Sequence, residues 1–448
     1  MQTQFSAEAL ADPHTRELEG ILRSCVHCGL CTATCPTYVT LGDERDSPRG
    51  RIYLIKDLLE TGRKIGPEDV APIDHCLSCL SCMTTCPSGV DYRRLVDAAR
   101  VQIHDSYRRP FFDAALRSLL VRLLPSPGAF RAALRLASIG RVFRPVVRRL
   151  PGLGPRLDAM LALAPRSLPA MAIGQTPGVF SPGAQTGAPR RMALLTGCAQ
   201  SVLAPQINAA AIRLLNRAGV EVVIAKGEGC CGSLAHHMGA EKRALAQARA
   251  DIDAWTREIE GEGLDAIVVT ASGCGATIKD YGYMLRDDPL YAEKARRVAS
   301  LARDVSEILP GLKLDYSPPR PLIVAYHAAC SLQHGQKIVD APKSLLRRAG
   351  FDARSIPEAH LCCGSAGTYN ILQPEIANTL RDRKVANIAR VKPDVIATGN
   401  IGCITQIASA TSTPVVHTVE LLDWASGGPA PAGLSRSTGS TAAVSKYR

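Results

Sequence analysis

Residues 25–36 read Cys-Val-His-Cys-Gly-Leu-Cys-Thr-Ala-Thr-Cys-Pro, and residues 76–87 read Cys-Leu-Ser-Cys-Leu-Ser-Cys-Met-Thr-Thr-Cys-Pro. Both runs have the spacing C-x2-C-x2-C-x3-C-P. Three thiolates on such a tight loop can wrap one metal centre, whereas the fourth, directly before a proline, points away toward a second centre. The two runs therefore predict two metal centres, each of which takes one ligand from the other's loop.

This spacing is the one by which bacterial-type ferredoxins bind [4Fe–4S] clusters, so we expect two such clusters in the N-terminal region. The alternatives are structural zinc, which usually takes its ligands as two separated pairs, and disulfide bonds. The expected ligands are Cys25, Cys28, Cys31 and Cys86 for cluster 1, and Cys76, Cys79, Cys82 and Cys35 for cluster 2.

Length and N-terminal sequence bound the class of protein. The 448 residues are enough for two or three domains. The first residues, MQTQFSAEALADPH, show no basic segment followed by an apolar one, so we expect a cytoplasmic chain whose sixteen cysteines stay reduced. No uncharged apolar run approaches the ~20 residues needed to cross a bilayer, so we do not expect a transmembrane protein.

The net charge of +12 is concentrated in one segment. Residues 107–156 contain eleven arginines, no lysine and one acid, Asp113, while the other residues are together close to neutral. No recognised nucleic-acid-binding motif accompanies these arginines, so we expect no nucleic-acid partner. Two interpretations stay open. The segment covers the cluster domain or grips an acidic partner subunit, or it docks on anionic lipid as a peripheral membrane contact.

Hydrophobic periodicity organises the first half. Residues 1–106 are expected to form the cluster domain, with one helix over residues 51–60 that ends at Gly62 and another over about 92–107.

Residues 107–190 are expected to form basic amphipathic helices followed, from residue 157, by a Pro/Gly-rich linker. The first of these helices should leave Arg117 and Arg122 outside its apolar face. That face consists of Leu116, Leu119, Leu120, Leu123 and Leu124.

From residue 191 onward, short apolar runs alternate with helical stretches such as residues 239–260 and 374–391. This alternation is typical of βαβ units around a parallel sheet. The predicted fold class is an α-helical two-cluster ferredoxin domain followed by a duplicated α/β domain with parallel strands. The expected strands are residues 192–196, 220–225, 266–270, 322–325 and 395–398.

The second half is an internal duplication, which predicts repeats over residues 191–315 and 316–430 and a disordered tail over 431–448. Each repeat has a single cysteine, a Cys-Cys-Gly triplet and a further cysteine after a strand that ends in threonine. The duplicated cysteines are Cys198, Cys230, Cys231 and Cys274 in the first repeat, and Cys330, Cys362, Cys363 and Cys403 in the second.

Open α/β folds place their sites at the carboxyl ends of the strands, so the four cysteines of each repeat are expected to converge there. Three interpretations stay open: a third iron–sulfur centre, a thiol or ligand pocket without a cofactor, and plain packing of cysteine as a small hydrophobe. Histidines near the repeat loops are more commonly hydrogen-bonding residues than ligands. They are His236, His237, His327, His334, His360 and His417.

One motif points to a function that we do not expect here. Residues 227–232 match G-x-G-x-x-G, the dinucleotide fingerprint, after a predicted strand. The fourth and fifth positions of the match are the Cys-Cys pair, and the sequence shows neither the helix nor the acidic residue that should follow. The sequence contains no Walker loop either, so we expect no flavin or nicotinamide site in this chain.

The chain resembles the iron–sulfur subunits of glycolate oxidase (glycolate dehydrogenase), which pair with FAD-linked subunits. The resemblance covers nearly all of the chain and is weakest over residues 108–190. Its Cys-Cys-Gly repeats are also similar to those of heterodisulfide reductases, in which the final cysteine belongs to a C-x-x-C pair. Thr277 and Gln406 stand at those partner positions here. The matching segments are residues 21–38, 48–56, 270–275 and 360–369.

The resemblance implies an electron-transfer subunit of a multi-subunit oxidoreductase, with no catalytic residue of its own. A partner subunit that carries FAD would oxidise glycolate to glyoxylate. Electrons would pass through the two [4Fe–4S] clusters to a quinone or another acceptor, at the cytoplasmic face of the inner membrane. The alternatives are a subunit of a D-lactate or glycerol-3-phosphate dehydrogenase, and a thiol–disulfide oxidoreductase of the heterodisulfide reductase kind.

Overall fold

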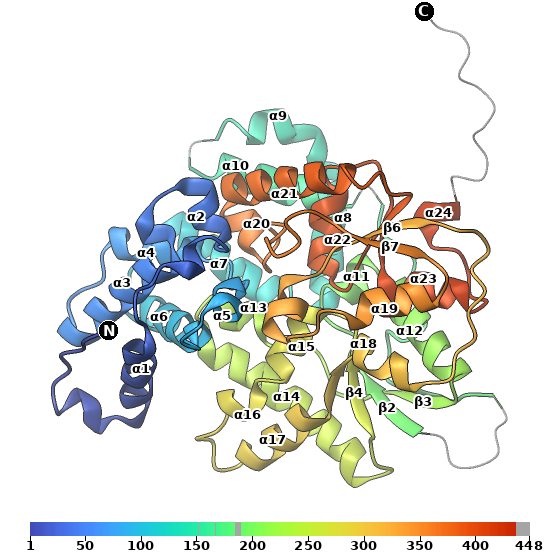
Figure 1. Cartoon of the computed structure of the whole chain (residues 1–448), viewed down its shortest axis with the longest axis horizontal. Helices are drawn as coiled ribbons and strands as arrows, with labels where there is room; N and C mark the ends of the chain where they lie inside the picture. Colours follow the sequence, from blue (N-terminus) through green and yellow to red (C-terminus); the bar gives the residue numbers. More distant parts are fainter. Residues whose placement is uncertain (151, 166, 184–189, 436–448) are drawn as a thin grey trace, which may run out of the picture.

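The computed structural model describes residues 1–150, 152–165, 167–183 and 190–435. A helical N-terminal lobe, blue in Figure 1, lies beside two α/β repeats drawn in green to red. The helical segment that follows the lobe in the chain packs against both repeats. The predicted disordered tail begins later than residue 431, because residues 432–435 form a helical turn and Leu434 packs into an apolar core. The rest of that tail, residues 436–448, lies outside the described residues.

Six α-helices build the N-terminal lobe around an apolar core. Four of them begin with proline, which has no N–H to lose at the first helical position. Both predicted helices are confirmed, and the first ends at Gly62 in the left-handed conformation. The helices are α1 (Pro13–Ser24), α2 (Pro36–Leu41), α3 (Pro48–Thr61), α4 (Pro67–His75), α5 (Ser81–Thr85) and α6 (Tyr92–Ser106), with 3-10 turns η1 (Ala9–Ala11), η2 (Leu30–Thr32) and η3 (Glu44–Asp46).

The basic segment forms helices that differ from the prediction in two respects. The expected linker is wrong over part of its length, because alanine and leucine extend a helix to residue 163 and residues 178–180 add a strand to a sheet. Leu119 is 49% exposed, whereas Arg117 is largely buried, because two carboxylates of Asp74 and Asp113 hold its guanidinium. The helices are α7 (Phe111–Leu123), α8 (Pro127–Gly140), the 3-10 turn η4 (Arg141–Phe143), α9 (Arg144–Val147) and α10 (Gly154–Leu163).

Each repeat contains one sheet, and the two sheets share the order of four strands, to which the first adds the edge strand β1. The first is ordered β1-β3-β2-β4-β5 and the second β7-β6-β8-β9. All neighbouring strands are parallel except β1, which pairs antiparallel with β3. The strands are β1 (Gly178–Phe180), β2 (Arg190–Leu194), β3 (Val220–Ile224), β4 (Ala266–Val269), β5 (Ala302–Asp304), β6 (Ile323–Tyr326), β7 (Asp352–Ser355), β8 (Val395–Thr398) and β9 (Val415–His417).

Helices cover both faces of the sheets, as the α/β class requires. The first repeat has α11 (Gln200–Leu203), α12 (Gln206–Arg217), α13 (Ser233–His237), α14 (Glu241–Glu260), α15 (Ser272–Ile278), α16 (Tyr281–Met284) and α17 (Ala292–Leu301). The rest of the described chain has α18 (Val305–Ile308), the 3-10 turn η5 (Leu309–Gly311), the π-helical turn η6 (Ser331–Gly335), α19 (Ala341–Arg348), α20 (Tyr369–Leu372), α21 (Pro374–Ala389), α22 (Ile401–Ala408), α23 (Thr418–Ala425) and α24 (Ala432–Ser435).

One hydrophobic core is shared by the two repeats. Alternate residues of a strand point to opposite faces of its sheet. In β2, Met192 and Leu194 therefore face a core that also contains Val324 and Val395 of the second repeat, while Ala193 faces a core of the first repeat alone. Helices α12 and α23 pack against each other across this shared core. The repeats are thus joined by apolar packing as well as by the chain.

The N-terminal lobe is held to both repeats by side-chain contacts. The guanidinium of Arg94 donates two hydrogen bonds of 2.6 Å to Asp280 of the first repeat. The Tyr369 hydroxyl of the second repeat donates to the carbonyl of His75, at 3.0 Å. These contacts bring the second cysteine run of the lobe next to the cysteines of the repeats.

Candidate metal centres and the cysteine-lined cavity

The two cysteine loops of the lobe adopt the same unusual backbone conformation. His27 and Gly29 flank the second cysteine of the first run with φ of 56° and 80°, and Ser78 and Leu80 do so in the second run with φ of 47° and 61°. Positive φ is costly for residues other than glycine and persists where the surroundings require it, most often at functional sites. The matched strain indicates that both loops are shaped for the same kind of ligand.

The residues expected to hold cluster 1 lie together. Cys25, Cys28 and Cys31 of the first run line one small cavity with Cys86, the last cysteine of the second run, and Cys82, expected in cluster 2, also lines it. Cys25 is buried, whereas Cys28 is exposed. This set of thiols therefore lies at the surface of the lobe.

The residues expected to hold cluster 2 lie deeper in the lobe. Burial raises the pKa of Cys82 well above its usual value, and the nearby thiols of Cys79, Cys76 and Cys35 raise it further. Cys35, the last cysteine of the first run, is thus close to the second run. Cys35, Cys76 and Cys82 are all buried.

Cations and hydrogen-bond donors surround this deeper set. Arg51, 1% exposed, lies with its Nη1 3.8 Å from the Cys35 Sγ and its Nη2 3.2 Å from Asp46. Burial opposes ionisation of the Cys76 thiol, but the guanidiniums of Arg51 and Arg100 hold its pKa below the ordinary value. The Tyr92 hydroxyl donates to the Cys76 sulfur at 3.6 Å. Four thiols with buried cations and hydrogen-bond donors beside them fit an iron–sulfur cluster, because such groups stabilise its thiolate ligands.

The cysteines of the repeats follow the carboxyl ends of the strands, as predicted. In the first repeat, hydrogen bonds from the Cys198 and Cys231 thiols and from a backbone N–H lower the pKa of Cys230 to about 4. Cys231 in turn lies beside Cys274. The Tyr281 hydroxyl donates to the Cys231 carbonyl at 2.9 Å and ties the loop to α16.

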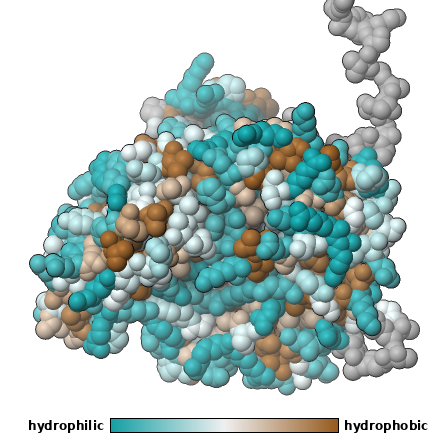
Figure 2. Space-filling view, viewed as in Figure 1, coloured by the Kyte–Doolittle hydropathy of each residue, from teal (hydrophilic) through white to brown (hydrophobic). Residues whose placement is uncertain are grey.

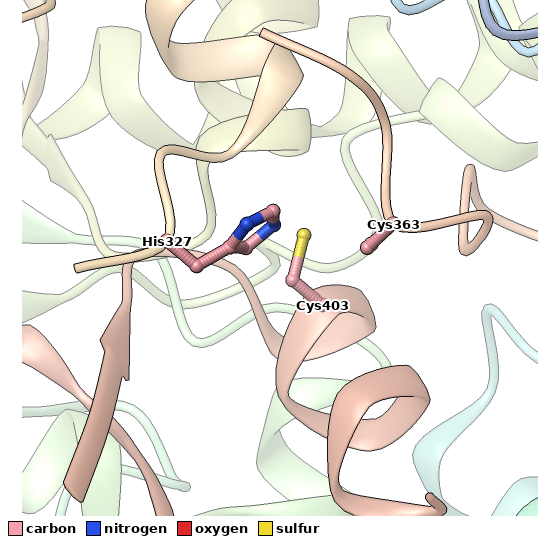
Figure 3. A group of neighbouring side chains, drawn as sticks. All are labelled: His327, Cys363 and Cys403. Carbon is pink, nitrogen blue, oxygen red and sulfur yellow. The ribbon is translucent and has the colours of Figure 1, made fainter. Parts of the chain in front are cut away.

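The second repeat adds a histidine to its four cysteines. His327, Cys363 and Cys403 place one ligand atom each within 4.8 Å of one another, and all three are buried. Figure 3 shows the His327 ring directed toward the Cys403 sulfur, which comes from the first turn of α22. Both ring nitrogens of His327 are buried without a hydrogen-bond partner among the described residues. Cys330 and Cys362 lie next to this group, and their thiols are hydrogen-bonded to each other.

The glycine of each Cys-Cys-Gly triplet allows a close backbone contact. Gly232 and Gly364 have φ of 82° and 87°, and a Cβ at these residues would lie 2.7 Å from the Ala244 carbonyl and 2.3 Å from the Ala377 carbonyl. Helices α14 and α21 therefore pack at equivalent positions against the two triplets.

This equivalence reveals an electrostatic difference that the sequence analysis missed. Two turns beyond the contact, α14 carries Asp251 and α21 carries Lys384, and both side chains are buried. Asp251 accepts a 2.7 Å hydrogen bond from the Gly229 N–H. The Lys384 ammonium donates to the Glu358 carbonyl at 2.8 Å and lies near all four cysteines of its repeat. The first site thus has a buried carboxyl where the second has a buried cation.

All eight repeat cysteines line one cavity of about 460 Å³. Leu77, Ser78 and Cys79 of the second cluster loop line it too, and helices α7, α8 and α10 supply an apolar wall. Cys79 packs against the small apolar cluster that contains Cys362, so the two residues lie close together.

Three of the six histidines near the repeats are hydrogen-bonding residues, as expected. His236 binds Asp97 at 3.1 Å, His334 binds Thr84 at 2.8 Å, and His417 binds the Thr270 carbonyl at 2.7 Å. His237 instead lines the cavity, and the carbonyl of His360 accepts from His334.

Comparisons with known proteins agree with this geometry. The family model described as a 4Fe-4S dicluster domain matches residues 21–90, and the one described as a cysteine-rich domain matches residues 192–279 and 324–408. The glycolate oxidase iron-sulfur subunit of Escherichia coli (strain K12) is 44% identical over 428 residues, which cover 95% of this chain and 99% of that protein. The chain belongs to the family of glycolate oxidase iron–sulfur subunits.

More distant members and relatives follow the same pattern. The probable glycolate oxidase iron-sulfur subunit of Bacillus subtilis (strain 168) is 32% identical, over 87% of this chain and 89% of that protein. Lactate utilization protein A of Bacillus licheniformis is 27% identical over 52% of this chain and 99% of its own length. A crystal structure of a hypothetical protein from Helicobacter pylori shares the fold, with a TM-score of 0.53 at 10% identity over 95% of this chain and 74% of that one.

Membership of the glycolate oxidase iron–sulfur subunit family makes this chain an electron-transfer component of an oxidoreductase complex, with two [4Fe–4S] clusters in its dicluster domain. Within the described residues, no helix is both long and apolar enough to cross a membrane.

Proposed function

We propose that this chain accepts electrons from an FAD-bearing partner that oxidises glycolate to glyoxylate and passes them to a quinone at the cytoplasmic face of the inner membrane. The observation that carries the proposal is the order of the two thiol sets. The first reaches the surface at Cys28, and the second lies between it and the cavity of the repeats. The [4Fe–4S] clusters supply one-electron transfer when bound.

We infer the ligands from the same arrangement. Cys25, Cys28, Cys31 and Cys86 hold cluster 1, and Cys76, Cys79, Cys82 and Cys35 hold cluster 2, each in the cavity or cluster of thiols that they share. Domain boundaries at residues 106, 190, 315 and 430 are proposed from the order of the elements: three of them fall between the elements of neighbouring units, whereas residue 190 is the first residue of β2.

The flavin-bearing partner docks, in this proposal, on the surface around Cys28. Exposed apolar side chains lie there on both cysteine-loop and α3 residues: Val26 is 66% exposed, Leu30 is 54% and Tyr53 is 62%. Brown patches interrupt the mostly teal surface of the lobe in Figure 2. Exposed apolar groups that border a redox centre are typical of transient electron-transfer interfaces.

The docking face can be tested with two matched charge substitutions. Leu30→Asp should weaken binding to the partner at least tenfold, whereas Leu290→Asp, on a residue 77% exposed in the first repeat, should leave binding unchanged. Co-purification and surface plasmon resonance measure both. Equal binding by the two variants would contradict the assignment of this face.

We also infer that the second repeat, and not the first, binds an additional iron–sulfur centre. Lys384 places a buried positive charge beside four cysteines and His327, which offsets the negative charge of thiolate ligands. Asp251 places a carboxyl at the matching position of the first repeat, where its protonated form offers ionised thiolates no compensating positive charge.

Iron analysis separates the two repeats. Cys403→Ser should lower the iron content below that of the wild type, whereas Cys274→Ser should leave it unchanged. Mössbauer spectra of anaerobically purified protein identify the centre that is lost. Loss of iron in both variants, or in neither, would contradict the inference.

The basic segment has contacts that support both of its interpretations. Arg109 and Arg117 pair with Asp74 of the lobe at 2.6 and 2.8 Å, so part of the segment covers the cluster domain. Farther along, exposed apolar residues alternate with exposed arginines, which suits the interface of an anionic bilayer. The exposed apolar residues are Leu136, Ile139, Val142, Phe143 and Val146, 60% to 79% exposed.

Membrane contact predicts a specific loss. Val142→Asp should reduce co-sedimentation with vesicles that contain anionic phospholipid, while Val339→Asp, on an exposed valine of the second repeat, should not. Unchanged sedimentation of both variants would exclude this surface.

For the complex as a whole, the decisive measurement is anaerobic co-purification followed by glycolate addition. Reduction of the clusters in electron paramagnetic resonance (EPR) spectra supports the proposal. Clusters that stay oxidised while the flavin is reduced would overturn it.

A further inference from the structure

The cavity at the repeats has two chemically different ends. One end is formed by the eight repeat cysteines together with Cys79 of the second cluster loop. The other is formed by leucine, methionine, alanine and phenylalanine side chains of helices α7, α8 and α10, which include Phe130, Leu134 and Leu161. Metal ligation by the thiols accounts for the cysteine-lined end of the cavity. It does not account for the apolar end.

The size and lining of the cavity as a whole suit a small organic molecule at its apolar end. The whole cavity, with its cysteine-lined end, measures about 460 Å³, which falls within the range of small-molecule and cofactor sites. Such sites are mostly apolar, with a few polar groups that fix orientation. Water is a poor occupant, because an ordered water needs two or more polar partners.

Polar groups also line the cavity, among them His237, Ser365 and Asn370. Burial lowers the pKa of His237 to about 3, so its imidazole is neutral and carries one N–H. The Asn370 amide already donates to Gln406 at 3.0 Å, which fixes its orientation. Neutral N–H and O–H donors in the lining of an apolar chamber suit a molecule with carbonyl oxygens on an otherwise apolar body.

The position of the chamber adds a redox requirement. Cys79 is a proposed ligand of the deeper cluster, and it lines the chamber beside Cys362. A molecule in the chamber therefore lies next to the place where electrons leave the N-terminal lobe. Helix α8 contributes Leu134 to the lining of the chamber and exposes Leu136 and Ile139 to solvent.

We propose that this chamber, between α7, α8, α10 and the cysteines of the repeats, binds the ring and the first part of the apolar tail of a membrane quinone. The inference rests on the proposed function and names the place where that function ends. The quinone takes two electrons, one at a time, from the cysteine-lined side and two protons from water, and leaves as the quinol. Glycolate oxidation in the partner subunit supplies both electrons.

Two neighbouring alanines of α8 provide a matched pair of variants. Ala133 lines the chamber, whereas Ala132 is exposed and does not line it. Ala133→Trp should fill the chamber and weaken binding of decylubiquinone at least tenfold, while Ala132→Trp should leave binding unchanged. Calorimetric titration of the full chain with its clusters measures the affinity. If Ala133→Trp lowers the iron content, Leu161→Phe takes its place, since Leu161 also lines the chamber.

Photoaffinity labelling with an azido-quinone locates the site directly. Labelled peptides from residues 116–137, 157–164, 233–237 or 365–371 support the inference, because all four segments line the chamber. Labels confined to other parts of the chain overturn it, as does equal binding of decylubiquinone by Ala133→Trp and Ala132→Trp. A phospholipid retained in the chamber that excess quinone does not displace also overturns it.

Failure of the chamber assignment and failure of the proposed function give different experimental results. Glycolate-dependent reduction of the clusters in the complex, measured by EPR without any quinone, tests electron transfer alone. If the clusters are reduced and no quinone binds in the chamber, the chamber assignment fails while the electron-transfer function stands. If the clusters are not reduced, the proposed function fails even where decylubiquinone binds.

Discussion

Replacement of Arg51 by glutamine should lower the reduction potential of the cluster held by the deeper thiol set. Arg51 is almost fully buried and places its Nη1 3.8 Å from the Cys35 sulfur. Glutamine removes the positive charge, and lysine at the same residue retains it. The two variants therefore separate the effect of charge from the effect of altered packing.

The magnitude follows from that distance. Unit charges 3.8 Å apart interact by ~4 kcal/mol at an effective dielectric constant of about 20. An added electron is spread over the whole cluster, so we take about half of this energy, ~2 kcal/mol, which corresponds to about 90 mV for a one-electron couple. Loss of the pair with Asp46 should also reduce the free energy of unfolding by about 3 kcal/mol.

Redox titration monitored by EPR measures the potential of each cluster in anaerobically purified protein. Arg51→Gln should shift the deeper cluster by about 90 mV to lower potential, whereas Arg51→Lys should shift it far less. If Arg51→Gln loses iron, Arg100→Gln replaces it, because the Arg100 guanidinium lies 2.6 Å from the Cys76 carbonyl. Equal shifts in the glutamine and lysine variants, or none in either, would refute the electrostatic reasoning.

Three further outcomes are expected. Cys35→Ser should change the EPR signal of the deeper cluster and leave that of the surface cluster intact; a change in the surface cluster alone would reverse the ligand assignment. Gly364→Ala should destabilise the protein by about 3 kcal/mol in urea unfolding, because the new Cβ would meet the Ala377 carbonyl at a positive φ. Gly427→Ala, with φ of 95° but open space around it, should cost only about 1 kcal/mol, and similar losses in the two would contradict the packing argument. Burial raises the pKa of Asp251 to about 8, above its unfolded value, so the stability that its protonated form contributes is complete below about pH 4 and is lost as pH rises toward 8. Asp251→Asn should flatten this decline of the melting temperature between pH 5 and 8, and parallel pH profiles would exclude Asp251 as its source.

Of the N-terminal lobe, the two cysteine loops and the helices α3 and α6 could be predicted, whereas α1, α2, α4 and α5 were not. Cysteine spacing determines the loop, a proline follows each run, and α3 ends at Gly62 as expected. The duplication was equally visible, since every cysteine of one repeat has a counterpart in the other. Both sheets and their matching strand order follow from that symmetry.

The strands that the sequence did not reveal are all at sheet edges. β1, β5, β7 and β9 each have only three or four residues and one hydrogen-bonded neighbour. β7 reads Asp-Ala-Arg-Ser and buries a single side chain, so its apolar signal is too weak to distinguish it from a loop.

The charge difference between the repeats was missed for another reason. Asp251 and Lys384 lie on helices well beyond the cysteine motifs, and only the packing of each triplet glycine against its helix makes them equivalent. Alignment of the two repeats on those glycines and helices would have placed Asp251 and Lys384 at the same aligned position. The apolar wall of the cavity carries no such internal signal, since leucines of α7, α8 and α10 read as ordinary helix faces.

The interior that β2 and β6 have in common makes the two halves of the duplication mutually dependent. Neither half can be excised as a free-standing module, because removal of one strips the inner side of the other's sheet. A chain terminated near residue 320 should therefore aggregate or be degraded. Joint folding also lets the two copies differ in chemistry, as Asp251 and Lys384 do, because either copy supports the sheet of the other.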